Sequence, residues 1–416
     1  MTRTAPPATA AGFSREQRRA LTVLGVSQAL GGAGMAAGIT VGALLAQDLL
    51  GSTSLTGLPA ALYTTGAALG AAALGRFCQR FGRRPGLALG NAVAALGSAG
   101  VVAGAAARWP ALLLAALFVY GAGTVTGLLA RYAGADLAPP GRRGRAAGTV
   151  LFAMTLGAVA GPNLIGPTGA LAHAWGIPRL AGPFLLAVAA YAAAALVLLV
   201  WLRPDPLLLA QSREPRDAGA GPGTGPRSPA LRAPGVLTGA TVMITAQLVM
   251  IAVMTMTPVH MTGHGQATQA VGLVIALHVG AMFLPSPLSG LLADRIGGRR
   301  VAAAAGAVLL AAGLSAGLAP PDSVALLACA LVLLGVGWNL ALLGGTALIA
   351  GAAPAENRAA VQGLADVGMS VAGATGGMAS GLVVGGSSYP VLATAAGALA
   401  LAVIPAVALS STRRHP

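Results

Sequence analysis

The sequence predicts an all-α membrane protein with twelve transmembrane helices arranged as two pseudo-symmetric bundles of six. Apolar residues make up 56% of the chain and charged residues only 8%, so polar surface could not cover a soluble globule of this length. Uncharged windows of about 20 residues, the length that crosses roughly 30 Å of hydrocarbon, follow one another along the chain. A glycine- and arginine-rich segment at residues 75–84 recurs at residues 290–300, which indicates a duplicated bundle.

The first half of the chain is predicted to form the N-terminal bundle, residues 14–202. The segment before it, residues 1–13, is expected to be disordered. The uncharged windows of this half, one for each expected span, lie at residues 20–47, 49–75, 85–107, 109–130, 146–178 and 180–202.

A polar segment at residues 203–234 interrupts the apolar pattern. It contains five arginines, three acids and seven prolines, and its glycine-, alanine- and proline-rich centre cannot bury enough apolar surface to fold. We therefore predict a flexible cytoplasmic linker between the two bundles. The C-terminal bundle is expected at residues 235–410, followed by a tail at 411–416. Its apolar windows are 235–293, which is long enough for two spans, 301–320, 324–352, 359–381 and 390–409.

The arginines predict the orientation of the spans. All 25 basic residues are arginine, and basic residues resist translocation and stay on the cytoplasmic side. With an even number of spans, both termini and the arginine-bearing turns lie on that side, and only Arg108 and Arg179 face outward. We therefore expect a multi-pass protein of a bacterial-type plasma membrane with both termini in the cytoplasm.

The composition excludes several classes of function. A net charge of +15 would suggest nucleic-acid binding in a soluble protein, but the arginines lie in short clusters between apolar runs and aromatic residues are only 4%. Two cysteines do not make a disulfide framework. The sequence has no metal-ligand cluster, nucleophile elbow or phosphate-binding loop. We therefore expect no enzymatic activity, no cofactor and no nucleic-acid partner.

The repeated segment has to reverse the chain in the headgroup region while carrying arginines. Gly75 and Gly82 permit close backbone approach or unusual backbone angles. The arginines that follow can pair with acids or with helix C-termini, and Asp136, just past the fourth span, is positioned to take Arg83. Headgroup anchoring and a specific interhelical contact are both open interpretations, and the recurrence in the second half favours the contact.

In these segments the chain resembles the major facilitator superfamily, whose cytoplasmic signature lies between spans 2 and 3 and between spans 8 and 9. In the family, the signature's acid faces the N-terminus of a helix in the opposite half, and its arginine pairs with an acid after span 4. Both contacts stabilise the state closed to the cytoplasm. By position, Asp294 would face the start of span 5 near Ala146, and Arg83 would pair with Asp136. Gln79 stands where the family has aspartate, so the N-half contact loses its charge.

The resemblance covers essentially the whole chain and assigns a conformational switch to both signature segments and to the acid after span 4. The residues assigned to this switch are Gly75, Gln79, Arg80, Gly82, Arg83, Arg84, Asp136, Gly290, Asp294, Arg295, Gly297 and Arg299.

Span 5 carries a second marker. Gly157, Gly161 and Pro162 resemble the span-5 motif of the family's antiporters, with one extra residue before the next glycine, Gly166. Small residues let helices pack closely in lipid, and proline removes a backbone hydrogen bond and can bend a helix.

Polar side chains inside the spans are candidates for the substrate path, because an amide near the membrane midplane is costly unless it faces a partner or a wet cavity. For each amide, a substrate contact and a helix-to-helix hydrogen bond are both open. The run of methionines, threonines and histidines at residues 254–264 fits the external mouth of this path better than a soft-metal site, and no metal site is expected. The candidates are Gln28, Asn163, Gln247, Met254, Trp338 and Asn339.

Proton coupling requires a group that loads and releases a proton inside the membrane. Asp366 is the acid that lies inside an apolar stretch, and at 1.5 Å per residue it is about 12 Å from Arg358, in the cytoplasmic third of its span. It is either a proton site or the partner of a signature arginine such as Arg80, and we favour the pair. Span 4, taken as residues 109–130, lacks the internal arginine of many proton-coupled relatives, and we expect no buried arginine.

These observations predict a monomeric secondary transporter whose two halves rock about a central site. A sparsely charged cavity favours hydrophobic drug-like or secondary-metabolite cargo over sugars and organic anions. The resemblance to antiporters implies proton-coupled efflux. Two alternatives stay open, namely an importer or facilitator of a small neutral solute and a membrane receptor that does not transport.

Overall fold

The computed structural model describes residues 14–50, 58–213, 233–354 and 356–403, and this part of the chain is helical, without strands. Nine helical segments within it are long and apolar enough to cross a membrane. Helices α1 and α2 and the shorter apolar helix α16 occupy the positions of the remaining three expected spans. The all-α architecture predicted from the sequence is therefore confirmed.

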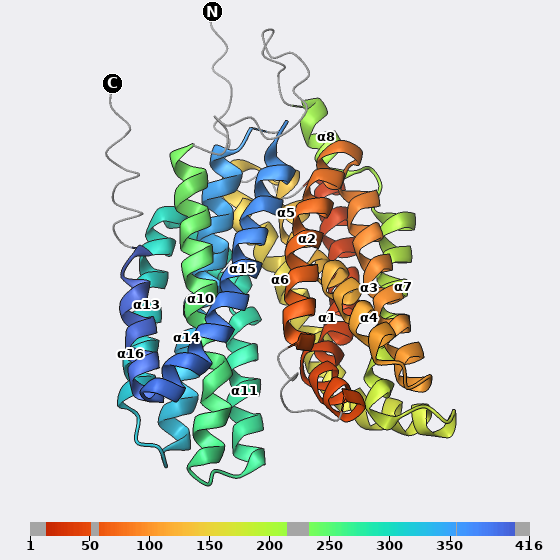
Figure 1. Ribbon diagram of the computed structural model, residues 1–416. Coiled ribbons are helices and arrows are strands. Elements are labelled where there is room, and N and C mark those ends of the chain that lie inside the picture. The colour runs from red at the N-terminus through yellow and green to blue at the C-terminus, as the bar shows by residue number, and fades with distance from the viewer. Residues whose placement is uncertain (1–13, 51–57, 214–232, 355, 404–416) are drawn as a thin grey trace, which may run out of the picture.

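The N-terminal bundle runs from red to yellow-green in Figure 1. A single residue, Val125, separates α4 from α5, so these two helices form one span. The short 3₁₀ turns η2 (Pro140–Arg142) and η3 (Arg179–Ala181) precede the last two helices. The helices are α1 (Arg15–Leu50), α2 (Leu58–Phe81), α3 (Arg83–Ala106), α4 (Pro110–Thr124), α5 (Thr126–Asp136), α6 (Arg143–Ala174) and α7 (Gly182–Trp201).

The C-terminal bundle stands beside the first, from green to blue in Figure 1. Helices α11 and α12 together form one span. The helices are α10 (Pro234–Gly263), α11 (Thr268–Phe283), α12 (Ser286–Ile296), α13 (Gly298–Leu318), α14 (Val324–Ala352), α15 (Arg358–Gly386) and α16 (Tyr389–Ala400).

Glycines set the close packing inside each bundle. A Cβ added at Gly157 of α6 would collide with the α1 backbone at Ala29 and Ala33. In the C-terminal bundle, Gly313 of α13 lies against Gly397 of α16 in the same way. Because lipid offers no hydrophobic driving force between helices, such close van der Waals contact is a main source of cohesion in the bundle.

Each signature segment is mostly helix rather than turn. The predicted second span ends at residue 75, but α2 continues to Phe81, and α12 likewise continues to Ile296. The chain reverses on one glycine in each case, Gly82 with φ 97° and Gly297 with φ 89°, in the left-handed region that favours glycine. The signature side chains are therefore held on rigid helix ends.

The first part of the predicted linker is folded, contrary to expectation. Residues Pro206–Arg213 form helix α8, whose Leu207 is buried in a small cluster with Cys78 of α2 and Ala359 of α15. Asp205 caps α8 by accepting hydrogen bonds from two of its backbone N–H groups, and its other oxygen accepts from Arg84 N at 2.7 Å. The rest of the linker, residues 214–232, and both predicted tails lie outside the described residues.

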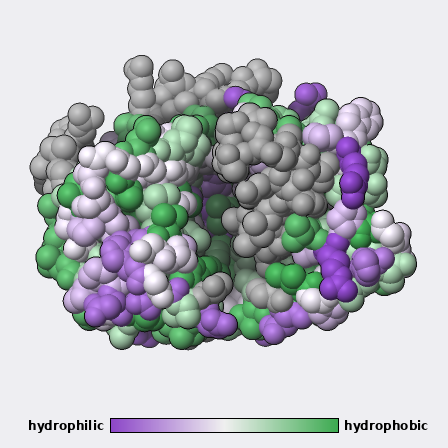
Figure 2. Space-filling view, turned by 60° about the horizontal axis from the view of Figure 1, so that its bottom comes forward, coloured by the Kyte–Doolittle hydropathy of each residue, from purple (hydrophilic) through white to green (hydrophobic). Residues whose placement is uncertain are grey.

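The two ends of the bundle pair differ. At the basic end, where α2 and α12 finish, α2 packs on α15 and α6 packs on α12. Figure 1 shows α2 beside α15. At the opposite end, a Cβ added at Gly166 of α6 or Gly272 of α11 would meet nothing within 4 Å. Figure 2 shows a hollow between the two bundles on that end. The described conformation is thus closed at the basic end and open at the other.

A bulky side chain in the α6–α12 contact should open the basic end. In Gly290→Leu the new side chain meets the backbone of Gly144, so the closed conformation should lose most of its population. Gly351→Leu is the matched control, because Gly351 lies at the end of α14 with open space around it. Spin-label distances between exposed Phe81 and exposed Leu364 measure the closure. An unchanged distance distribution in Gly290→Leu would count against this contact as a gate.

Candidate functional site

A carboxylate from the C-terminal bundle caps a helix of the N-terminal bundle. Asp294, near the end of α12, accepts hydrogen bonds from Gly144 N and Arg145 N, each at 2.8 Å. These N–H groups belong to the first turn of α6, where no intrahelical partner exists and the helix dipole favours negative charge. The structure therefore brings Asp294 to the helix start that the family resemblance indicates.

A second contact of the same kind crosses in the other direction. Gln79 of α2 accepts a hydrogen bond through Oε1 from Ala359 N at 2.8 Å, in the first turn of α15. Gln79 and Asp294 are 215 residues apart, and so are Gly144 and Ala359, so the two contacts are pseudo-twofold equivalents. The glutamine keeps the hydrogen bond that the family's aspartate would make and gives up the charge.

The glycines of the signature allow this approach. A Cβ at Gly75 would lie 2.8 Å from Cα of Gly363 on α15, and one at Gly290 would collide with Gly144 on α6. Any larger residue at these positions would hold α2 and α12 away from the helix starts that they cap. In each half, the same signature segment therefore supplies both the glycine that lets the two helices come close and the side chain that caps the neighbouring helix.

A buried ion pair supports the reversal between α2 and α3. Arg83 Nε lies 2.8 Å from Asp136 Oδ2, and both side chains are almost fully excluded from solvent. This is the partner expected for Arg83 from the sequence. A third residue, Gln362 of α15, accepts a hydrogen bond from Arg83 Nη2 at 2.5 Å, so this layer also joins the bundles.

A second buried ion pair corrects two expectations. Arg131 of α5 donates to Asp366 Oδ1 of α15 at 2.7 Å, and each side chain is at most 1% exposed. Arg80, the partner favoured for Asp366, is exposed instead, with its guanidinium over the Phe81 ring. The expectation of no buried arginine was also wrong. Span 4 does not end before the first charge, since the uncharged residues 132–135 continue the helix to Asp136.

Arg131 is held by several partners besides Asp366. Its Nε donates to Thr346 Oγ1 of α14 at 3.0 Å, and its Nη2 also donates to Tyr132 OH at 2.7 Å. Its guanidinium lies 4.1 Å from the centre of the Tyr132 ring. Asp366 Oδ2, by contrast, is buried and has no hydrogen-bond partner among the described residues. The pair therefore crosses the bundle interface and leaves one carboxylate oxygen available to a proton.

The remaining switch arginines lie around this core. Arg84 donates from Nε to Leu199 O at 2.8 Å, which ties α3 to the end of α7. Arg295 is exposed at the end of α12, and Arg299 is partly buried in the first turn of α13. These positions place all three arginines at the basic end of the bundle pair.

Two amides of the predicted substrate path join helices. Gln28 of α1 donates to Gly127 O of α5 at 2.7 Å. Asn339 of α14 is fully buried and donates to Met282 O and Ser286 Oγ, both at 2.7 Å. Of the two interpretations open for these amides, the structure shows the helix-to-helix hydrogen bond. Asn163 is exposed and bonds within its own helix, to Val159 O.

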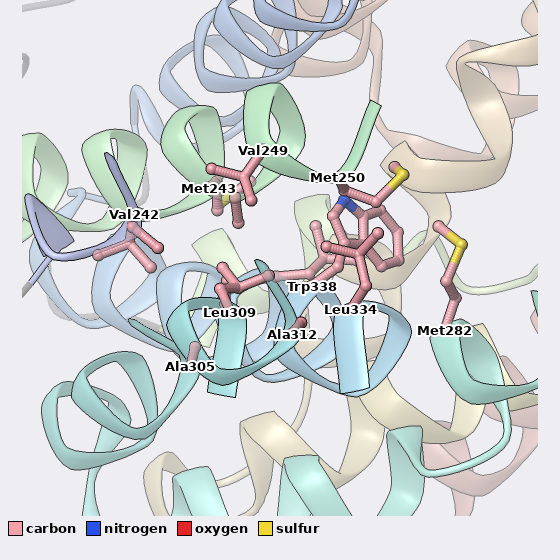
Figure 3. Close-up of a cluster of buried hydrophobic side chains, with 14 of the residues drawn as sticks. Val242, Met243, Val249, Met250, Met282, Ala305, Leu309, Ala312, Leu334 and Trp338 are labelled. Carbon is pink, nitrogen blue, oxygen red and sulfur yellow. The ribbon is translucent and has the colours of Figure 1, made fainter. Parts of the chain in front are cut away.

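Trp338 and Gln247 form a polar contact inside an apolar cluster. Trp338 Nε1 donates to Gln247 Oε1 at 2.7 Å, and Phe283 of α11 meets the indole edge-on at 5.8 Å between ring centres. Figure 3 shows the indole beside Met250 of α10. Gln247 and Met254 are partly buried, and both lie on α10. These residues stay candidates for the substrate path.

The span-5 marker has a packing role in this conformation. Helix α6 is continuous through Pro162, and Gly157 lies against the α1 backbone. Gly161 is buried one turn further along. Gly157 therefore lets α1 and α6 approach closely, and α6 is not interrupted at Pro162.

Sequence reasoning missed Arg131, Thr346, Gln362 and Ala359 as members of this site. Arg131 could have been found, because an uncharged run of helix-forming and small residues follows it. Ala359 acts through its backbone N–H, which no side-chain pattern reveals.

Two helical bundles that close on each other at one end through crossing hydrogen bonds and an ion pair are the arrangement expected of a transporter whose halves move against each other. The model of the Major Facilitator Superfamily matches residues 21–284 and 241–416, and the chain belongs to this family. It is thus a multi-pass membrane transporter rather than an enzyme.

Relatives of this chain include transporters of two bacteria. The MFS-type transporter YddS of Bacillus subtilis is 50% identical over 393 residues, 94% of this chain and 90% of that protein. The riboflavin transporter RfnT of Brucella anthropi is 31% identical over 357 residues, 84% of this chain and 85% of that protein. Among solved structures, the proton:xylose symporter XylE has a TM-score of 0.74 at 18% identity, covering 97% and 96% of the two chains, and shows the shared fold.

The charge of Asp294 should stabilise the closed basic end. A hydrogen bond to a charged acceptor contributes about 1.5–3 kcal/mol, so Asp294→Asn should reduce the closed population by about tenfold and slow transport, with substrate binding nearly intact. Asp322→Asn, in the loop before α14 at the opposite end, is the control and should change neither. Transport rates in proteoliposomes test this, and a wild-type rate in Asp294→Asn would contradict the role.

Proposed function

We propose that this protein is a secondary active transporter of the plasma membrane that works by alternating access, with its basic end and both termini in the cytoplasm. The crossing contacts of Asp294, Gln79 and Arg131 support this, because all of them close one end of the bundle pair. The arginine bias supports the orientation, since basic residues stay on the cytoplasmic side. The described conformation is then the outward-facing one, and the inward-facing one requires these contacts to separate.

Asp366 is proposed as the proton-coupling residue, on the strength of its buried pair with Arg131 across the bundle interface. The attraction between the two charges holds the basic end closed. A proton on Asp366 neutralises it and removes this attraction, while its unpartnered Oδ2 offers a place for the proton. Breaking a buried pair by removing one charge costs about 3–5 kcal/mol, enough to shift a conformational equilibrium by about two to four orders of magnitude.

The cargo proposed is a hydrophobic small molecule, such as a drug or secondary metabolite, that is exported by proton antiport. Its support is the apolar character of the side chains around the interface of the bundles, where Met35, Leu128 and Met254 pack on one cluster with Met154 and Trp338. The span-5 resemblance to antiporters supports the direction. A monomer suffices, because the gate is formed within one chain.

A second candidate is uptake of a small neutral solute, which the relationship to a riboflavin transporter favours. One experiment separates the two. Everted and right-side-out vesicles with an imposed pH gradient are tested with lipophilic dyes and with riboflavin. Proton-driven dye accumulation in everted vesicles supports export, and riboflavin accumulation in right-side-out vesicles supports uptake. The absence of any gradient-dependent flux across a broad substrate panel would contradict secondary active transport.

Asp366→Asn should uncouple transport from the proton gradient. The amide cannot exchange a proton, so uphill transport should fall to background while downhill equilibration persists at a reduced rate. Asp322→Asn is the matched control, because that acid lies in the loop between α13 and α14. Uphill transport by Asp366→Asn under an imposed pH gradient would exclude Asp366 as the coupling residue.

Arg131 and Asp366 should also show strong energetic coupling. The single variants Arg131→Gln and Asp366→Asn each leave one buried charge without its partner, whereas the double variant leaves none. Thermal unfolding of the purified chain should give an interaction energy of about 1–3 kcal/mol in the double-mutant cycle. Additive effects of the two substitutions would contradict the pair.

A further inference from the structure

The end of α10, at the open end of the bundle pair, carries His260 in its last turn and His264 directly after the helix, and the gate uses neither. His264 is the C-cap residue of α10, with φ −105° and ψ 21°, so it turns out of the helix four residues after His260. Their ring centres are 4.4 Å apart, and the ring planes are inclined by 56°. His264 is exposed and His260 is partly exposed, so both are accessible from the open end. The short distance between the rings brings two imidazoles, a ligand type that transition metal ions prefer, within reach of each other.

The hydrogen bond of His264 fixes which nitrogen is free. Its Nδ1 lies 2.8 Å from the backbone oxygen of His260. A carbonyl oxygen only accepts, so Nδ1 carries the proton and the lone pair of the neutral ring is on Nε2. Metal-binding histidines almost always donate their other ring N–H to a carbonyl or carboxylate in this way, which sets the tautomer and the ring orientation.

The His260 ring is fixed by stacking. It lies parallel to the Tyr389 ring of α16, with 4.3 Å between centres and 15° between planes. The Tyr389 hydroxyl in turn shares a hydrogen bond of 2.9 Å with Thr257 Oγ1, one turn before His260. Both imidazoles are therefore oriented before any ligand binds, which reduces the ordering cost of binding.

We propose that His260 and His264 form a binding site for a divalent transition metal ion of the Zn²⁺, Cu²⁺ and Ni²⁺ class. Imidazole nitrogens suit these ions. The described residues contain no group of three or more histidine, cysteine or acidic side chains, so water completes the ligand set. This departs from the sequence expectation of no metal site. It is also not a soft Cu(I) site, because Met254 and Met256 of the same run pack on the apolar cluster instead.

A bound ion has a structural consequence at the open end. His260 links α10 to α16 through Tyr389, and α10 also carries the substrate-path candidates Gln247 and Met254. An ion held by both histidines stiffens the last turn of α10, so millimolar or lower external Zn²⁺ should slow transport.

The test uses the purified full chain, free of any histidine tag, with Cu²⁺ and Zn²⁺ as probes. Electron paramagnetic resonance should show one Cu²⁺ per chain with couplings to two imidazole nitrogens. His264→Ala should remove one coupling and weaken Zn²⁺ binding in calorimetry at least about tenfold. Lowering the pH from about 7.5 to about 5.5 should also weaken binding, because protonated imidazoles cannot bind metal.

Two controls keep the result specific. His173→Ala removes an exposed histidine of α6 and should leave binding unchanged, whereas Tyr389→Phe keeps the stacked ring but loses its hydrogen bond to Thr257 and should weaken binding less than His264→Ala does. Size-exclusion chromatography checks that each variant is folded. Wild-type affinity in the His260→Ala/His264→Ala double variant, or no binding of either ion to the wild type, would overturn the proposal.

Discussion

The ion pair between Arg131 and Asp366 is the interaction on which the closed conformation depends most. Both charges are almost completely removed from water, and each comes from a different bundle. A buried charge without a partner is far more costly than a buried pair, so the two bundles cannot part here unless water enters or a proton neutralises the acid. Under the proposed coupling role of Asp366, closure of the basic end responds to protonation of this carboxylate.

The two halves have equivalent backbone positions at the gate, but the side chains at these positions differ in charge. Asp294 and Gln79 occupy equivalent positions and cap equivalent helix starts, yet only Asp294 is charged. Arg131 and Thr346, which are also 215 residues apart, touch each other across the interface. The charged residues of the gate are thus concentrated on α3, α5 and α15, and the α6–α12 contact relies on one carboxylate and on close glycine packing.

Much of the fold and part of the site could be predicted from the sequence. Hydropathy and arginine clusters locate the spans because lipid requires long uncharged helices, and the repeated signature identifies Asp294 and Arg83 with their contacts. The sequence pattern does not reveal Arg131 as a membrane residue, because a charge normally marks the end of a span. Here the charge is compensated by an acid that lies 235 residues away in the sequence. Helix α8 could not be predicted from the proline- and charge-rich composition of its segment. The composition does not show that Leu207 packs in a buried cluster with residues of two other helices.

For the amide residues, too, the sequence predicts only part of the site. A buried amide must find a hydrogen-bond partner, and the sequence cannot say whether this partner is a ligand or a neighbouring helix. In this conformation Gln28 bonds to Gly127 and Asn339 to Ser286, while Oδ1 of Asn339 is buried without a partner among the described residues, so a substrate contact stays a prediction. Gln247 differs because it is only partly buried. Its Oε1 accepts the hydrogen bond from Trp338, and its Nε2 takes no part in that bond.

The most direct test of the account is a pair of spin-label distances in the wild-type chain across a range of pH. One pair, Phe81 with Leu364, reports on the basic end, and the other, Leu164 of α6 with Leu273 of α11, reports on the opposite end. The account predicts that acidification lengthens the first distance while it shortens the second, because protonation of Asp366 releases Arg131. Distances that stay fixed, or that change in the same direction at both ends, would contradict alternating access through this gate.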